Sequence, residues 1–285
     1  MRIWLLAAAV LLTAQAAPAL ADDRDPYSGA PLPPHKREAA SPITDHFYAQ
    51  AAFYAPRVST NFRVDPAYAP AGVTGTSVDG QTDLGLPSRL RQGVVEFMFR
   101  LRERNKVRVD YYEANLSGSA VLANDVVFGN ETFAAGQLAQ TTFNWQQFAI
   151  TYTYSFIRNN RFEVGTGVAV YLLQLDVIGQ VPAQFQYQEV SAATPLPAVP
   201  IDFTWAISRR WSATAHGAYV KGSLNGTHGW YADSHEDVQY RWNPNFVVGA
   251  GYSSTRASLA KSGGSSPGAF DMSIHGPQVF VRFSF

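Results

Sequence analysis

Large apolar residues alternate with small or polar ones along most of this chain, which is the pattern of β-strands with two unlike faces. The run from residue 148 to 156, FAITYTYSF, is typical. Its aromatic and aliphatic side chains share one face, and alanine, threonine and serine share the other. The same alternation occurs in the runs VVEFMFRLR, RFEVGTGVAVYL, IDFTWAI and VFVRFSF. The pattern therefore predicts an all-β chain.

The apolar face could line the inside of a soluble β-sandwich or cover the outside of a transmembrane β-barrel. The barrel is favoured because the opposite face carries glycine, serine, threonine and charges that can form ion pairs. The runs are also longer than the roughly 5–6 residues usual in soluble sheets. The charged fraction of 15% is low beside the roughly 25% of soluble domains. In lipid the sheet must close, since an open edge would leave backbone groups unpaired.

Short and long connections alternate along the chain. The short ones are RERNK, RNNR, SRR and NPN, and the long ones are expected at 66–89, 119–139, 179–195, 225–234 and 261–268. This order predicts an antiparallel up-and-down barrel with periplasmic turns and extracellular loops. The ten expected strands are 50–65, 91–102, 106–118, 140–157, 161–178, 196–207, 211–224, 235–242, 245–260 and 269–285. Eight or twelve strands stay open as alternatives, because residues 75–86 could pair as an extra hairpin arm.

The first part of the chain reads as a targeting segment. Residues 1–21 carry one basic residue, Arg2, then an apolar stretch, and end in Ala-Leu-Ala. This predicts a secretory signal peptide cleaved near Ala21, since the apolar stretch is shorter than the roughly 20 residues of a spanning helix. Residues 22–47 are rich in proline and mixed charge, which predicts a disordered periplasmic lead-in. The barrel is then expected at 48–285.

The chain ends on a strand with aromatic or aliphatic residues at alternate positions: Val279, Val281, Phe283 and Phe285. This strand resembles the C-terminal assembly signal of bacterial outer-membrane barrels. Together with the runs DLGL, ITYTYSF and DVQYRW, it makes the chain similar to small proteobacterial outer-membrane β-barrel proteins of uncharacterised function. The resemblance implies a Gram-negative outer-membrane location. As partners it implies outer-membrane lipids and lipopolysaccharide, periplasmic chaperones and the barrel assembly machinery. It is silent about activity.

If the aromatic face meets lipid, alternation sends charges of both signs into the lumen. These residues are Arg57, Arg63, Glu96, Arg100, Arg102, Arg108, Asp110, Glu163, Asp202, Arg241 and Arg282. They could line an anion-selective pore or pair with one another and fill the lumen. The second interpretation is favoured, because a barrel of about eight to ten strands is scarcely wider than its side chains and unpaired buried charge is costly. The balance of 22 basic and 22 acidic residues agrees with internal pairing and does not favour nucleic-acid binding.

The expected function is a non-enzymatic structural or surface barrel, or a narrow passive pore. The alternative is a lipid or peptide hydrolase at the extracellular rim. Its best candidate is Asp233-Ser234-His235-Glu236-Asp237, although adjacent strand residues point to opposite faces. A metal site formed by His228, His235, Asp233 and Asp237 is conceivable, but no spacing is diagnostic. The chain has no cysteine and no P-loop or dinucleotide fingerprint, so no cofactor is expected.

Tryptophan and tyrosine residues stand close to the ends of several expected strands. Such positions predict aromatic girdles at the two membrane interfaces. The residues are Trp145, Trp205, Trp211, Trp230, Tyr231, Tyr240 and Trp242.

Overall fold

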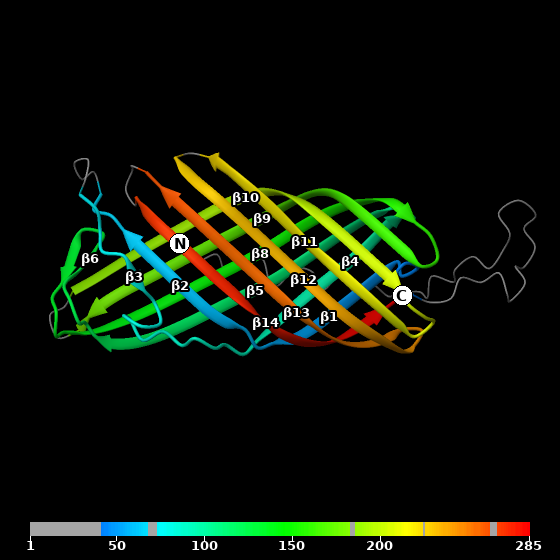
Figure 1. Cartoon of the computed structure of the whole chain (residues 1–285), viewed down its shortest axis with the longest axis horizontal. Coiled ribbons are helices and arrows are strands. Elements are labelled where there is room, and N and C mark those ends of the chain that lie inside the picture. Colours follow the sequence, from blue (N-terminus) through cyan, green and yellow to red (C-terminus); the bar gives the residue numbers. More distant parts are fainter. Residues whose placement is uncertain (1–40, 68–72, 183–185, 225, 263–266) are drawn as a thin grey trace, which may run out of the picture. The chain divides into compact units, whose positions relative to one another are not determined.

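The computed structural model describes residues 41–67, 73–182, 186–224, 226–262 and 267–285. Within this part of the chain, ten antiparallel strands form a closed barrel, in which β1 pairs with β14 (Figure 1). The strands of the ring are β1 (Phe47–Tyr54), β4 (Gln92–Arg102), β5 (Asn105–Val121), β8 (Leu138–Arg158), β9 (Phe162–Val181), β10 (Gln186–Ala206), β11 (Trp211–Leu224), β12 (Thr227–Asn243), β13 (Phe246–Lys261) and β14 (Gly268–Ser284). The all-β class, the antiparallel barrel and its ten strands are confirmed. Among the described residues, no helix is long and apolar enough to cross a membrane.

Two further strands, β2 (Arg57–Val64) and β3 (Val78–Asp79), lie on the loop side of the barrel, where β4 is short. β2 continues β1 after a break at Pro56 and pairs with the first half of β14. β4 pairs with β5 only as far as Val94 opposite Tyr112. Further along β2, Asn61 and Phe62 pair with the two residues of β3. The possible hairpin arm at 75–86 is therefore reduced to these two paired residues.

The strands are longer on the loop side than the sequence predicts. β10 begins at Gln186 instead of 196, and β12 begins at Thr227 instead of 235. Residues 186–195 pair with β9, and residues 227–234 pair with both β11 and β13. The loops expected at 179–195 and 225–234 are thus mostly wrong, because cross-strand pairing overrides the weak strand propensity of these segments. Figure 1 shows β6 (Val126–Phe128) at the loop end of the barrel, where it pairs with β7 (Glu131–Phe133).

The outer surface divides into an apolar and a polar zone along the strands. Large exposed apolar side chains lie on the halves next to the short turns, and include Phe97, Phe99, Ile150, Tyr152, Tyr154, Val168, Val170, Leu172, Val199, Ile201, Phe203, Val279, Val281 and Phe283. On the loop side, most outward residues of the strands are polar, among them Glu113, Asn115, Gln140, Asn144, Gln174, Asp176 and Asp271, while Val121 and Leu138 are exposed apolar exceptions. The apolar zone is the band that a membrane-spanning barrel presents to lipid.

The lumen shows the opposite division. On β8, Phe143 and Trp145 point inward on the loop side, and Thr151, Thr153 and Ser155 point inward on the turn side. Every second residue points inward on both sides of Gln147. The inward residues are mostly apolar before Gln147 and mostly polar after it, and most outward residues change in the opposite sense. The turn-side half is therefore a membrane barrel with a polar interior. The loop-side half is built like a water-exposed barrel with an apolar core.

This exchange corrects two of the predicted girdle positions. Trp145 and Tyr231 are 1% and 0% exposed, and both lie in the lumen rather than at a membrane interface. By contrast, Trp205, Trp211 and Trp242 are exposed on the outer face near the turns. Trp211 and Trp242 each contact the ring of Tyr240, so a turn-side girdle is present.

Candidate functional site

A buried ion-pair network crosses the lumen in the turn-side half. The carboxylate of Glu163 on β9 accepts hydrogen bonds from both terminal nitrogens of Arg100 at 2.7 and 3.0 Å. The Nζ of Lys106 lies 3.5 Å from the same carboxylate. The carboxylate of Asp202 on β10 accepts hydrogen bonds from Lys106 at 3.0 Å and from Arg108 at 2.5 Å. No side chain of the five is more than 10% exposed. Three cations and two anions thus connect four strands across the interior.

A second layer of polar contacts joins this network to the opposite wall. Glu96 accepts a hydrogen bond from the hydroxyl of Tyr48 and lies 3.5 Å from both Arg108 and His216. The guanidinium of Arg282 stacks over the Tyr48 ring, 4.1 Å from its centroid. Arg282 also donates to the amide oxygens of Gln50 and Gln239 at 2.6–2.9 Å. The layer thus pairs charges across its width, although the Nε of Arg108 and the Nε2 of His216 have no hydrogen-bond partner among the described residues.

Residues 41–46 close the turn-side mouth of the barrel. Asp45 accepts Arg241 at 2.6 Å, and the backbone oxygens of Asp45 and Ile43 accept Arg100 and Arg158. Ile43 and Asp45 are 2% and 4% exposed. Burial raises the pKa of the Asp45 carboxyl, and Arg241 offsets only part of that rise.

These residues fall within the lead-in that was expected to be disordered, and the structure corrects this for 41–47. Residues 41–46 form an ordered closure, and Phe47 opens β1. Residues 1–40, with the expected signal peptide and the cleavage site near Ala21, lie outside the described residues.

Most of the predicted lumen residues share the interior. Glu96, Arg100, Arg108, Glu163, Asp202, Arg241 and Arg282 are all buried there and take part in the contacts above. Asp110 lies half-buried on the inward face, opposite Glu96 in the pairing of β4 with β5.

Three predicted lumen residues lie elsewhere, for two separate reasons. The inward side chains of β2 are Val58, Thr60, Phe62 and Val64. Arg57 and Arg63 therefore face outward, because β2 belongs to the half of the barrel whose interior is apolar. Arg102 is displaced by an irregularity in the pairing between Arg100 and Arg102, which breaks the alternation and leaves Arg102 exposed next to the turn.

The sequence interpretation missed two members of the network. Lys106 stands at the boundary between the expected turn RERNK and the expected strand 106–118 and is not among the predicted lumen residues, but β5 begins at Asn105 and directs Lys106 inward opposite Arg100. Asp45 was placed in the lead-in. The alternation of Lys106, Arg108 and Asp110 was a usable signal for the first residue. No local pattern marks Asp45.

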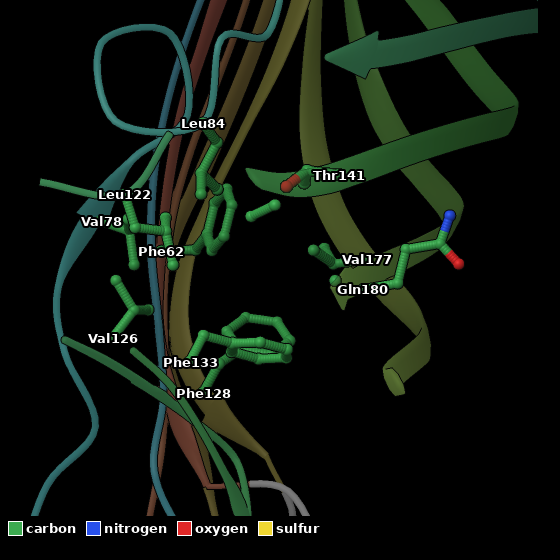
Figure 2. Close-up of a pocket in the computed structure, with 12 residues that line it drawn as sticks. Phe62, Val78, Leu84, Leu122, Val126, Phe128, Phe133, Thr141, Val177 and Gln180 are labelled. Carbon is green, nitrogen blue, oxygen red and sulfur yellow. The ribbon is translucent and has the colours of Figure 1, made fainter. Parts of the chain in front are cut away.

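An apolar core fills the loop-side half of the lumen. Its buried side chains come from the barrel wall, from the β6–β7 hairpin and from the segment around β3: Phe62, Val78, Leu84, Leu86, Leu116, Leu122, Phe128, Phe133, Phe143, Trp145, Leu173, Val177, Phe270, Met272 and Ile274. Figure 2 shows Phe128 and Phe133 of the hairpin below Phe62, with Val177 and Gln180 on the facing wall. The lumen is closed here by apolar packing, as it is closed by ion pairs on the other side.

The segment 233–237 lies inside β12 and not at a loop base. Asp233 and His235 point inward, and the Nε2 of His235 lies 3.0 Å from Asp233. The other ring nitrogen meets the hydroxyl of Ser253 on β13 at 2.8 Å. Ser253, which is paired with His235 across strands, replaces the predicted Ser234. Ser253 is itself buried, with 2% exposure.

The predicted metal ligands do not converge on one point. Asp237 accepts the hydroxyl of Thr214 at 2.7 Å, while His228 is exposed near the end of β12. Over the described part of the chain, no group of three or more histidine, cysteine, aspartate or glutamate side chains is placed to hold a metal ion.

The C-terminal residues of the predicted assembly signal line the outer face of β14. Val279, Val281, Phe283 and Phe285 are 41–62% exposed, and β14 closes the barrel against β1. The backbone oxygen of Phe285 accepts hydrogen bonds from His46 and Phe47. The signal therefore lies on the strand that seals the ring.

The ring of ten antiparallel strands with its outer apolar band is the fold of Gram-negative outer-membrane β-barrels. The outer-membrane protease OmpT of Escherichia coli shares it with a TM-score of 0.54 at 8% identity, over 84% of this chain and 96% of that chain. The toluene transporter TbuX of Ralstonia pickettii matches over 88% and 92% at 9% identity and a TM-score of 0.36. The attachment invasion locus protein Ail of Yersinia pestis matches over 84% and 98% at 8% identity and a TM-score of 0.31. No protein-family model and no curated protein sequence matches the chain.

Proposed function

We propose that this protein is a closed, non-enzymatic outer-membrane barrel with a structural or surface role, and not a passive pore. The observation that carries the proposal is the filling of the lumen by two consecutive layers. The ion-pair network occupies the turn-side half, and the apolar core occupies the loop-side half. A solute crossing the barrel would have to break paired buried charges and then displace packed aromatic rings, and both steps are costly.

The proposed location is the outer membrane, reached after cleavage of the signal peptide near Ala21. The apolar band and the fold shared with outer-membrane barrels support it. In this setting the band contacts outer-membrane lipids and lipopolysaccharide, and the strand ending at Phe285 is presented to the barrel assembly machinery after delivery by periplasmic chaperones. The similarity to small proteobacterial barrel proteins is part of the same proposal.

A lipid or peptide hydrolase is the alternative function. Ser253, His235 and Asp233 provide the types of groups that nucleophilic catalysis needs, in hydrogen-bond contact. Two observations favour the non-enzymatic role. Ser253 is almost fully buried, and Asp233 is already engaged by Thr255 at 2.7 Å. The contacts are those of a satisfied interior network.

The proposal predicts that the barrel passes no small solutes. Liposomes containing the refolded full-length protein should swell in isotonic sugar solutions no faster than protein-free liposomes, because neither lumen layer leaves a continuous aqueous path. A swelling rate that rises with the amount of protein and falls with sugar size would show an open pore and contradict the proposal.

A further inference from the structure

We propose that the loop-side end of the lumen is a binding site for a small, ring-sized apolar molecule, closed in this structure by two phenylalanine rings of the chain itself. The site is the pocket between the β6–β7 hairpin and the inner wall of β8 and β9 (Figure 2). It is separate from the ion-pair network, and it does not depend on whether the barrel conducts solutes.

The lining of the pocket defines the chemistry of the guest. Apolar side chains from five separate segments make up most of it, including Phe62, Leu84, Phe128, Ala139 and Val177. Thr141 and Gln180 are the polar side chains of the lining, and Figure 2 shows the amide of Gln180 directed away from the rings. A charged or strongly polar guest would lose its hydration without replacement hydrogen bonds, and an apolar guest would not.

The cover of the pocket is built from loop segments and not from the barrel wall. The hairpin is tied to the first long loop through two hydrogen bonds between Thr76 and Val127, and to the end of β2 through Gly129 and Val64. The side chains of Phe128 and Phe133 extend from this cover into the barrel. Because the outer surface at this level is polar, the cover faces water, and a guest can arrive without passing the ion pairs.

The free space in the closed site is small. About 350 Å³ lies between the lining atoms when the opening to solvent is counted, and only about 30 Å³ of it leaves room for a water molecule to move. The aromatic rings of Phe128 and Phe133 border this space, and Phe128 lies edge-on to Phe62 at a centroid distance of 6.0 Å. A guest of ring size therefore fits only when the two rings move aside with the hairpin, and the apolar lining selects an apolar guest.

Gly179 on β9 provides a way to fill the site. A Cβ atom at this position would lie 3.9 Å from Phe128 and 4.0 Å from Phe133, in ordinary van der Waals contact. Gly179→Val therefore places its two additional methyl groups into the space next to the rings. Gly222→Val on β11 is the matched control, because a Cβ atom there has no neighbour within 4 Å.

The experiment is a titration of the full-length protein in detergent micelles with benzene, followed by amide shifts in NMR spectra. We expect saturable shifts at Gly179, Gln180 and the hairpin, but not at the turn-side residues 103–104. Gly222→Val should bind as the wild type does, and Gly179→Val should bind about tenfold or more weakly. Gly179→Ala serves as a milder variant with a smaller loss if Gly179→Val does not fold.

Two results would overturn the site. The first is the absence of saturable shifts at these residues in the wild-type protein, which would make the pocket part of a packed core without a guest. The second is saturable binding that neither substitution at Gly179 weakens, which would place the benzene elsewhere.

Discussion

Asp202→Ala is expected to lower the free energy of unfolding by about 3–5 kcal/mol, as is found when one partner of a buried ion pair is removed. Asp202 accepts both Lys106 at 3.0 Å and Arg108 at 2.5 Å in the lumen. Its loss leaves two cations close together with Glu163 and Glu96 as their remaining partners, at 3.5 Å each. These two longer contacts compensate the desolvation of the cations less well than Asp202 does.

Urea titration of the protein refolded into lipid vesicles measures this loss. Asp271→Ala is the control, since Asp271 lies exposed on the outer face of β14, and its removal should change the unfolding free energy by less than about 0.5 kcal/mol. If Asp202→Ala were as stable as Asp271→Ala, the lumen network would not hold the strands together.

Val281→Arg is expected to destabilise the barrel by up to about 2–4 kcal/mol, the cost of an arginine on the lipid face near the bilayer midplane. Val281 is 41% exposed within the apolar band of β14. Ser273 lies on the same face of the same strand, at the loop-side level. Ser273→Arg should cost about 0–1 kcal/mol, since water reaches that level.

The same unfolding titration compares the two arginine variants directly. It tests where the membrane lies along the strands, because strand, face and introduced side chain are all matched. Equal costs for Val281→Arg and Ser273→Arg would mean that the membrane does not end between the two positions.

The barrel could be predicted from the sequence because its signal is repeated in every strand. Alternation in runs such as FAITYTYSF assigns both strand and face, and the short turns separate neighbouring strands. The ends of β10 and β12 could not be predicted in this way. Their loop-side residues have the composition of loops and are held in strands by pairing with neighbours on both sides.

The charged part of the lumen was largely accessible to prediction, because Glu96, Arg100 and Arg108 follow the inward parity of their strands. The exceptions have physical causes. Arg102 leaves the lumen at an irregular pair next to the turn. Arg57 and Arg63 were assigned inward on the assumption that apolar faces always meet lipid. That assumption fails beyond the membrane, where Phe62 and Trp145 form an apolar core inside a polar wall.

Side-chain contacts between residues that are distant in the chain could not be predicted from the sequence. The meeting of His235 with Ser253 depends on the register of β12 against β13. The closure of the turn-side mouth depends on Asp45 reaching Arg241, 196 residues away in the chain. Neither contact leaves a local spacing that could be read, because register is fixed by the assembled sheet.

Ion pairs fill one half of the proposed closed lumen and apolar side chains fill the other. Single-channel recording of the refolded full-length protein in planar lipid bilayers measures whether this filling closes the barrel. A membrane that contains the inserted barrel should show the same flat baseline as a protein-free membrane, without discrete current steps. Regular steps of constant size would mean a continuous aqueous path through the ion-pair layer and the apolar core, and would contradict the closed barrel.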